Sequence, residues 1–248
     1  MMRRAHLTAC VTLLLTAGMA VAQPSAGEWV NYRDAYRAMV LFDKYGGPKN
    51  LLNNHLQVVP RQKGVLGPDV QLLMKGGTVQ SGLALDALGR TTLPLLKAAY
   101  DQNAVLSPSR SLGGFTVKPR VSLAPRAEGA IGAYNVTELI AACEQALDFA
   151  RYTDSSLRGR QCVGVRLVFP KEGEAASVHL RLGGNMVALE PTRGAAFAGD
   201  VDDDFPVVTY RFAQAPVKGA ALHLITTRLA NAKVLTYNAP VAIVPLFE

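Results

Sequence analysis

Acidic side chains are densest in one short segment, Asp200-Val201-Asp202-Asp203-Asp204. Carboxylates at alternating positions of a loop suit a hard cation such as Ca²⁺, which takes six to eight oxygen ligands. The segment lacks the glycine and the glutamate that an EF-hand loop places at its sixth and twelfth positions. An acidic turn exposed to solvent explains the same residues, and the sequence favours that interpretation. The candidate calcium ligands are Asp200, Asp202 and Asp204.

Motifs for nucleophilic or metal-dependent catalysis do not occur in the chain. The histidines beyond the N-terminal segment, His55, His179 and His223, do not stand at metal-ligand spacing from one another or from a cysteine. The patterns Gly-x-Ser-x-Gly, Ser-x-x-Lys and His-Glu-x-x-His are absent. A carboxylate pair for glycoside hydrolysis could be drawn from the 19 acidic residues, but any chain with so many acids offers that choice. We predict no cofactor other than Ca²⁺ and favour a non-catalytic protein, with enzymatic activity left open.

Two cysteines, Cys143 and Cys162, remain once the N-terminal segment with Cys10 is set aside. An even number of cysteines in an oxidising compartment predicts a disulfide, whereas a redox-active pair is usually closer in sequence. Closing a loop of about 20 residues stabilises a fold by roughly 3 kcal/mol on the chain-entropy model. We predict that this pair is a structural disulfide.

The segment 1–22 has the pattern of a secretory signal peptide. Arg3 and Arg4 precede an apolar run over 7–21, and Ala20-Val21-Ala22 matches the small-x-small pattern of a cleavage site. An N-terminal membrane anchor is the alternative, but the run is short and is interrupted by Thr and Gly. We predict a periplasmic or secreted protein that does not span the membrane after cleavage.

The positive charge of the chain is moderate and scattered. The formal net charge is +7, and loss of Arg3 and Arg4 with the signal leaves 24 basic and 19 acidic side chains, a net charge of +5. The chain has no run of five Lys or Arg and no basic stripe interleaved with aromatic residues, so we predict no nucleic-acid partner. An envelope protein, or an anionic glycan or lipid, is the partner that this charge allows.

Four sequence segments recur in the same order, which predicts a tandem duplication. Three of the matches lie at offsets of 107 to 110 residues, and the fourth lies at 121. We predict two modules, 23–128 and 129–248, each long enough to bury its own core. The matched segments are 42–45 with 149–152, 58–60 with 168–170, 70–77 with 178–184, and 119–125 with 240–245.

Each predicted module opens with a helix. In the first module, Ser25 and Glu28 have the spacing of a capping box. Apolar residues then recur at steps of three and four from Trp29 to position 40, which predicts one apolar helix face. In the second module, Asn135 can cap a helix with the same period.

The rest of each module has the pattern of about six short strands between Gly, Pro and Asp turns. A parallel α/β fold is disfavoured because helical patterns do not alternate with strands. The predicted fold is α+β and mainly β: two tandem repeats, each with one N-terminal helix and a small antiparallel β-sandwich or barrel. The predicted strands are 55–59, 70–75, 79–85, 91–95, 104–106 and 115–123, then 162–169, 177–182, 186–189, 207–212, 221–226 and 234–244.

These observations favour an exported, non-catalytic binding protein of the cell envelope, whose ligand is a protein or an anionic envelope component. Two tandem modules are expected to leave a cleft between them, where ligands often bind. The candidate ligand-binding residues are Lys44, Lys49 and Arg61, because they differ from their counterparts at matched turns. The alternatives are an inhibitor or immunity-type protein, a periplasmic chaperone, and a hydrolase of envelope polymers with its site between the modules.

Overall fold

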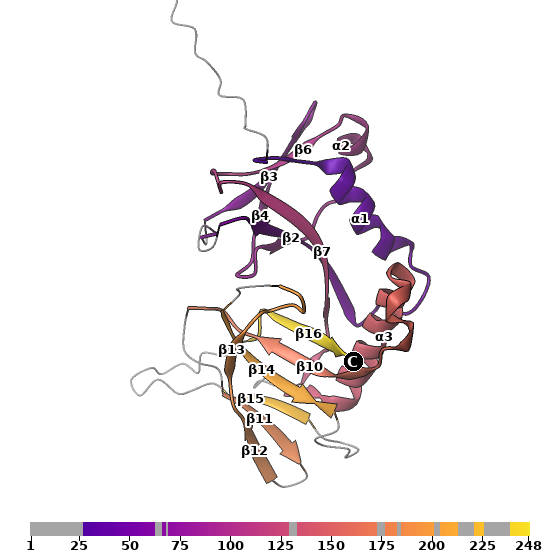
Figure 1. Cartoon of the computed structure of the whole chain (residues 1–248), viewed down its shortest axis with the longest axis vertical. Helices are drawn as coiled ribbons and strands as arrows, with labels where there is room; N and C mark the ends of the chain where they lie inside the picture. Colours follow the sequence, from indigo (N-terminus) through magenta and orange to yellow (C-terminus); the bar gives the residue numbers. More distant parts are fainter. Residues whose placement is uncertain are drawn as a thin grey trace, which may run out of the picture.

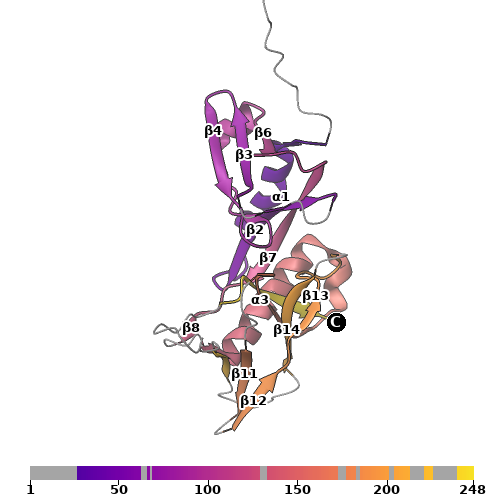
Figure 2. The same cartoon turned by 90° about the vertical axis from the view of Figure 1, so that its left-hand side faces the viewer.

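The computed structural model describes residues 27–62, 66, 67, 69–128, 133–172, 177–182, 185–200, 204–212, 221–225 and 239–248. These residues form antiparallel sheets and three α-helices, so the fold is mainly β, as predicted (Figure 1). The N-terminal and C-terminal halves lie at opposite ends of the long axis (Figures 1 and 2). Within these ranges, no helix is both long and apolar enough to cross a membrane. The predicted signal peptide lies outside the described residues.

The first half consists of a long helix, a short helix and seven strands among its described residues. Helix α1 buries Tyr32, Ala35 and Met39, whose spacing of three and four residues places them on one face. The elements are β1 (Val30–Asn31), α1 (Tyr32–Lys44), β2 (Leu52–Pro60), β3 (Gln71–Gly76), β4 (Val79–Ala84), β5 (Arg90–Thr91), α2 (Lys97–Asp101), β6 (Val105–Pro108) and β7 (Phe115–Leu123).

The second half again places a long helix before a longer series of strands. Helix α3 buries Leu139, Ala142, Cys143 and Ala146, the apolar face that the sequence predicts. The elements are β8 (Ala127–Glu128), β9 (Ala133–Asn135), α3 (Val136–Thr153), the 3₁₀ turn η1 (Ser155–Gly159), β10 (Cys162–Val168), β11 (Ser177–Leu182), β12 (Asn185–Leu189), β13 (Thr192–Gly194), β14 (Phe205–Arg211), β15 (Ala221–Ile225) and β16 (Ala242–Phe247).

The N-terminus of α1 differs from the prediction. The helix begins at Tyr32, and the Asn31 side chain caps it by accepting a hydrogen bond from Arg33 N at 2.8 Å. Trp29 precedes the helix and is 43% exposed, so the helix does not begin at the predicted capping box of Ser25 and Glu28. The reason is that residues 30–31 pair with β6 as a strand, which delays the start of the helix. Ser25 itself lies outside the described residues. The second helix is capped by Asn135, as predicted.

One sheet of seven strands runs through both halves, in the order β13-β14-β10-β16-β7-β2-β5. The halves join where β7 pairs antiparallel with β16, and Leu123 and Ile243 are the paired residues there. Pro119 in β7 and Pro245 in β16 have no backbone N–H to donate, which limits this ladder. The two strands therefore separate beyond the paired residues.

A smaller antiparallel sheet belongs to each half. The order is β1-β6-β3-β4 in the first half and β12-β11-β15-β9-β8 in the second. All of these sheets are open, so the predicted alternative of a closed barrel is wrong. The physical reason is that the outer edges of β7 and β16 meet each other across the halves, at Leu123 and Ile243, instead of closing within either half.

The two long helices lie on the same side of the molecule, and their C-terminal ends meet (Figure 1). Tyr32 and Met39 of α1 are buried in the core of the first half. Leu139 of α3 is buried in the core of the second half, which also includes Leu123 from β7. A third apolar cluster, with Phe197 and Val244, includes residues of β10, β14 and β16 that lie outside these two cores.

Candidate functional site

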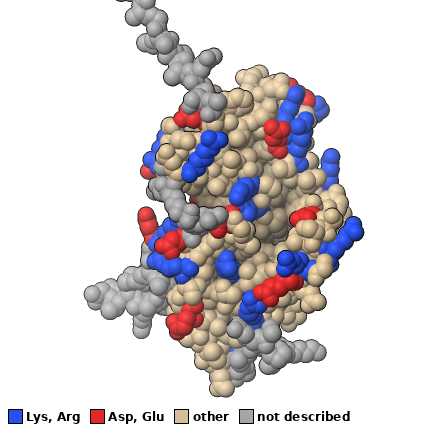
Figure 3. Space-filling model, viewed as in Figure 1, with Lys and Arg blue, Asp and Glu red and all other residues tan. Residues whose placement is uncertain are grey.

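A cleft of about 530 Å³ lies where the two halves meet, beside the junction of β7 with β16. Figure 3 shows a hollow in this part of the surface, with Lys and Arg side chains around it. We call it the inter-half cleft. Its lining residues are Pro119, Arg120, Val121, Leu157, Arg160, Arg166, Phe197, Ala198, Thr209, Arg211, Val244, Pro245, Leu246, Phe247 and Glu248.

Three neighbouring strands, β16, β10 and β14, form the floor of the inter-half cleft. Their registers place Arg166 between Val244 on one side and Thr209 on the other. Residues directly opposite each other in antiparallel strands have side chains on the same face. This row of the floor therefore has the cation of Arg166 between the apolar Val244 and the hydroxyl group of Thr209.

Gly164 lets β14 approach β10 closely in the next row of the floor. It is paired with Leu246 on β16 and with Arg211 on β14, at a point where the register of β10 and β16 shifts. A Cβ atom at position 164 would come within 2.3 Å of the carbonyl oxygen of Tyr210, so the close approach of β14 requires glycine. The β14 backbone therefore fills the place that a Cβ at position 164 would take, and no side chain stands between Leu246 and Arg211.

Arg166 is anchored but not saturated with hydrogen bonds. Its Nη1 donates to the carbonyl oxygen of Ala195 at 2.7 Å. Its Nε is buried and has no acceptor in the described part of the chain. A buried donor without a partner costs about 1–3 kcal/mol. The guanidinium of Arg166 has five N–H donors, and its hydrogen bond to Ala195 uses one of them.

Arg211 forms an ion pair with Glu248 at the rim. Arg211 Nη2 donates to Glu248 Oε1 at 2.6 Å, and both side chains are about half exposed. This hydrogen bond lowers the pKa of the Glu248 carboxyl, and the positive charge of Arg160 acts in the same direction. The main chain of Glu248 is fixed by two hydrogen bonds with Gln161, at 2.6 and 3.0 Å. An internal carboxylate is thus held beside the cations of the cleft.

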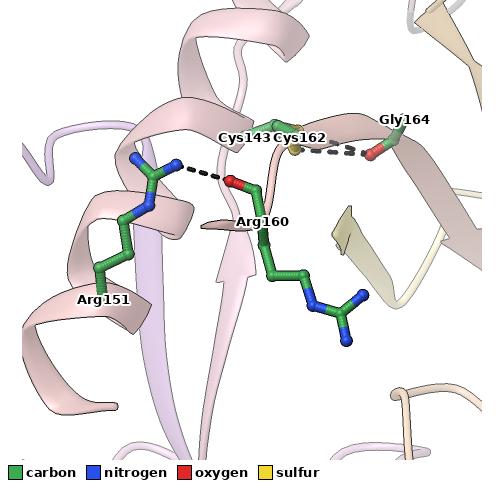
Figure 4. Close-up of a disulfide and its surroundings, with 5 residues drawn as sticks. All are labelled: Cys143, Arg151, Arg160, Cys162 and Gly164. Atoms are coloured by element: carbon green, nitrogen blue, oxygen red, sulfur yellow. Dashed lines mark hydrogen bonds between the residues drawn. A yellow bond between two sulfur atoms is a disulfide. The ribbon is translucent and has the colours of Figure 1, made fainter. Parts of the chain in front are cut away.

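Arg160 reaches the cleft because a disulfide and a hydrogen bond position its backbone. Cys143 in α3 and Cys162 at the start of β10 form the predicted disulfide, with Cα atoms 6.0 Å apart. Arg151 Nη2 donates to the carbonyl oxygen of Arg160 at 2.6 Å (Figure 4). In the same view the Arg160 side chain extends away from α3. The disulfide therefore helps to shape the cleft as well as the fold.

Arg120 is already matched by protein groups. Its Nε donates to Gln57 Oε1 at 2.7 Å, and its Nη2 bonds to the Asp200 carboxylate. Its guanidinium also lies over the ring of Phe197, 4.5 Å from the centroid. Lys118 Nζ reaches the same Asp200 oxygen at 3.3 Å. Arg120 thus builds the wall of the cleft and brings little free charge to it.

The inter-half cleft carries a positive charge on a mostly apolar lining. Four arginines and one glutamate line it, which gives the lining a formal charge of +3. The planar donors of arginine match carboxylate and phosphate oxygens, often with two parallel hydrogen bonds. Arginine stays protonated at every physiological pH, so these groups bind anions and do not exchange protons. The geometry therefore suits the binding of an anion.

A second polar cluster ties the halves together on the other side of the β7–β16 junction. Arg90 is nearly fully buried, and its Nη2 donates to the carbonyl oxygen of Val241 at 2.5 Å. Its Nε donates to Asp86 Oδ2 at 2.9 Å. His55 lines a cavity of about 340 Å³ with these residues, and its Nδ1 is buried without a hydrogen-bond partner among the described residues. Burial lowers the pKa of His55, and the charge of Arg90 lowers it further.

The predicted ligand-binding residues lie outside the inter-half cleft. Lys49 Nζ donates to three carbonyl oxygens at the end of α1, at 2.7 to 3.1 Å, and so caps that helix. Lys44 is exposed in the last turn of α1, and Arg61 is exposed after β2. Their role in ligand binding stays a prediction.

Two of the predicted calcium ligands, Asp200 and Asp204, lie beside cationic side chains. Asp200 is bonded to Lys118 and Arg120, and Asp204 lies 4.0 Å from Arg193. Asp202 lies outside the described residues. Among the residues that the structure describes, no three His, Cys, Asp or Glu side chains are grouped as a metal ion requires. The calcium site stays a prediction.

The arginines of the cleft were not singled out by the sequence, although a signal was present. Arg120, Arg166 and Arg211 occupy predicted strands whose other residues are largely apolar. A charged residue inside an apolar strand indicates either an exposed face or a buried polar site. The choice between them depends on what packs across the sheet, and the sequence does not contain that information locally.

In comparisons with known proteins, no protein-family model, curated protein sequence or solved structure matches the chain. Its function therefore has to be inferred from the inter-half cleft and the groups that line it.

Proposed function

We propose that the protein is an exported, non-catalytic binding protein of the cell envelope, and that it holds an anionic ligand in the inter-half cleft. One observation carries the proposal. Arg160, Arg166 and Arg211 come from three different segments and line the same cleft of about 530 Å³. Hydrogen bonds between guanidinium groups and anionic oxygens are about twice as strong as those between neutral groups.

Binding suits the lining better than catalysis does. A general acid or base needs a pKa near the working pH and a position beside the reacting group. The lining offers arginines, one threonine and Glu248, whose carboxylate is occupied by Arg211. Fixed positive charges with apolar neighbours can hold and orient an anion without a chemical step.

We also infer that the two halves are copies of one unit. The pairing order β1-β6-β3-β4 has a counterpart in β9-β15-β11-β12, and the β2–β7 pair has one in β10–β16. Both long helices are capped by an asparagine that directly precedes them. In this interpretation the antiparallel contact of β7 with β16 lies on a pseudo-two-fold axis, and the inter-half cleft is beside that axis.

Ligand retention tests the proposed function. The chain would be recovered from the envelope fraction of cells that express it, washed, and extracted for mass spectrometry of bound small molecules. We expect an anion in stoichiometric amount with the wild type and a loss of that anion with an Arg166→Met, Arg211→Met double variant. Arg193→Met is the matched control, because Arg193 is an exposed arginine that does not line the cleft.

Two results would count against the proposal. Retention of the same anion by the double variant would remove the inter-half cleft as its site. A stoichiometric protein partner with no small anion would instead favour the inhibitor or chaperone alternatives. Thermal unfolding of each variant shows whether it is folded before the extracts are compared.

A further inference from the structure

The inter-half cleft is larger and more apolar than a simple anion needs. Nine of its fifteen lining residues have apolar side chains. We propose that the cleft takes an amphiphilic anion, in which a phosphate or carboxylate group is joined to a hydrocarbon chain. This inference rests on the proposed function and names the class of its ligand.

The charged group of such a ligand has a defined place on the floor. Arg166 pairs with Thr209, and Arg211 follows two residues later on the same face of β14. Arg166 and Arg211 are therefore diagonal neighbours across two strands, a separation that long side chains span. A single anionic group can therefore accept from both guanidinium groups.

The hydrocarbon part has a place beside the same floor. Leu246 and Arg211 flank Gly164 on the two neighbouring strands, with no side chain between them. Phe247 continues the apolar lining on β16, and Leu157 adds to it from η1. A small inorganic anion would leave these side chains against water, whereas a hydrocarbon chain would cover them.

Titration calorimetry with a chain-length series tests this inference. The probes are inorganic phosphate and the butyl, hexyl and octyl monophosphates, each below its micelle concentration. We expect the affinity to rise by about fourfold for each added methylene until the cleft is full. Octanol and octylamine are the controls for charge, and we expect both to bind far more weakly than octyl phosphate.

Matched variants locate the binding. Arg166→Met is expected to weaken octyl phosphate binding by about 10- to 100-fold, the effect of a lost hydrogen bond to a charged group. If the Arg166 variant does not fold, Arg211→Met tests the same site, because the Arg211 side chain is half exposed and its loss disturbs the fold less. Leu157→Ser should flatten the dependence on chain length and leave the affinity for inorganic phosphate unchanged. Arg193→Met should match the wild type.

The outcomes separate this inference from the proposed function. Equal affinities for inorganic and octyl phosphate, both reduced by Arg166→Met, would overturn the inference that the ligand is amphiphilic. The proposal that the cleft binds an anion would stand. Octanol binding as tightly as octyl phosphate would also overturn it, since the charge would then contribute nothing. Failure of every phosphate to bind the folded wild type would overturn the proposed function itself.

Discussion

The rings of Phe42 and Phe149 pack edge to face, with their centroids 5.1 Å apart. Beside them, the rings of Tyr45 and Tyr152 lie 5.3 Å apart. Under the proposed duplication these are pairs of equivalent residues, one from the end of α1 and one from the end of α3. Contact between equivalent residues is the property of a two-fold symmetric interface, as in a dimer whose two chains have been joined.

Replacement of these phenylalanines should weaken the association of the halves. Phe42→Ala and Phe149→Ala are each expected to lower the free energy of unfolding by about 2–3 kcal/mol, since both side chains are only partly buried. The double variant should lose about 1 kcal/mol less unfolding free energy than the two single variants lose together. The reason is that each single variant already removes the contact between the two rings. Urea unfolding of the four proteins measures this coupling, with Leu41→Ala as a control at an exposed position of α1. Strictly additive losses would mean that the ring contact contributes nothing.

Local patterns were sufficient to predict most of the elements. The predicted strand 115–123 coincides with β7, and 177–182 coincides with β11. Both segments alternate side chains between two faces, so the period of two is visible in the sequence. The short helix α2 lies between two predicted strands and was not predicted, because five residues are too few to show a helical period.

The way in which the halves join could not be predicted in the same manner. The β7–β16 contact links residues about one half of the chain apart. The sequence of each segment shows that it forms a strand, but it does not show which other strand pairs with it. Arg166 and Arg160 acquire their positions from this contact and from the disulfide, not from their neighbours in sequence. Lys49, in contrast, was selected because it differs from its counterpart at a matched turn, and its ammonium group is bonded to helix carbonyls.

The disulfide should stabilise the fold and the wall of the inter-half cleft together. A Cys143→Ser, Cys162→Ser double variant is expected to lose roughly 3 kcal/mol of unfolding free energy, the value for a loop of this length. Because the disulfide fixes the start of β10, next to Arg160, the variant should also bind octyl phosphate more weakly. Thermal unfolding and calorimetry, with and without reductant, measure the two effects. A variant with reduced stability and unchanged affinity would show that the disulfide does not shape the cleft.

His55 should make the stability of the protein depend on pH. Burial and the charge of Arg90 lower the pKa of His55 in the folded state, while Asp86 acts in the opposite direction. The unfolded chain therefore takes up this proton at a higher pH than the folded protein. Stability is fully present above the unfolded pKa of about 6.5 and is lost as the pH falls from there through the folded pKa.

Urea unfolding of the wild type and of His55→Gln between pH 8 and pH 5 measures this dependence. We expect the free energy of unfolding to fall less steeply toward low pH in the variant, which cannot gain a proton at position 55. The pair measured at pH 8, where His55 is neutral in both states, gives the effect of the substitution apart from its charge. Parallel pH profiles for the two proteins would rule out a contribution from this histidine.

Glu248 should compete with a bound anion for Arg211. The hydrogen bond from Arg211 lowers the pKa of this carboxyl, so Glu248 keeps its negative charge to a lower pH than an ordinary glutamate does. Glu248→Gln raises the formal charge of the lining from +3 to +4 and removes the ion pair between Glu248 and Arg211. We expect the variant to bind octanesulfonate about two- to fivefold more tightly at neutral pH, a range typical of exposed ion pairs.

The pH dependence of that difference identifies its cause. Octanesulfonate stays ionised throughout, so the charge that changes with acidification in this ion pair is that of Glu248. The advantage of Glu248→Gln should therefore be present at neutral pH and disappear as the pH falls through the folded pKa of Glu248. Asp204→Asn removes an exposed acid that does not line the cleft and should bind like the wild type at every pH. Equal affinities of Glu248→Gln and the wild type at neutral pH would mean that the carboxylate does not occupy the position of the ligand.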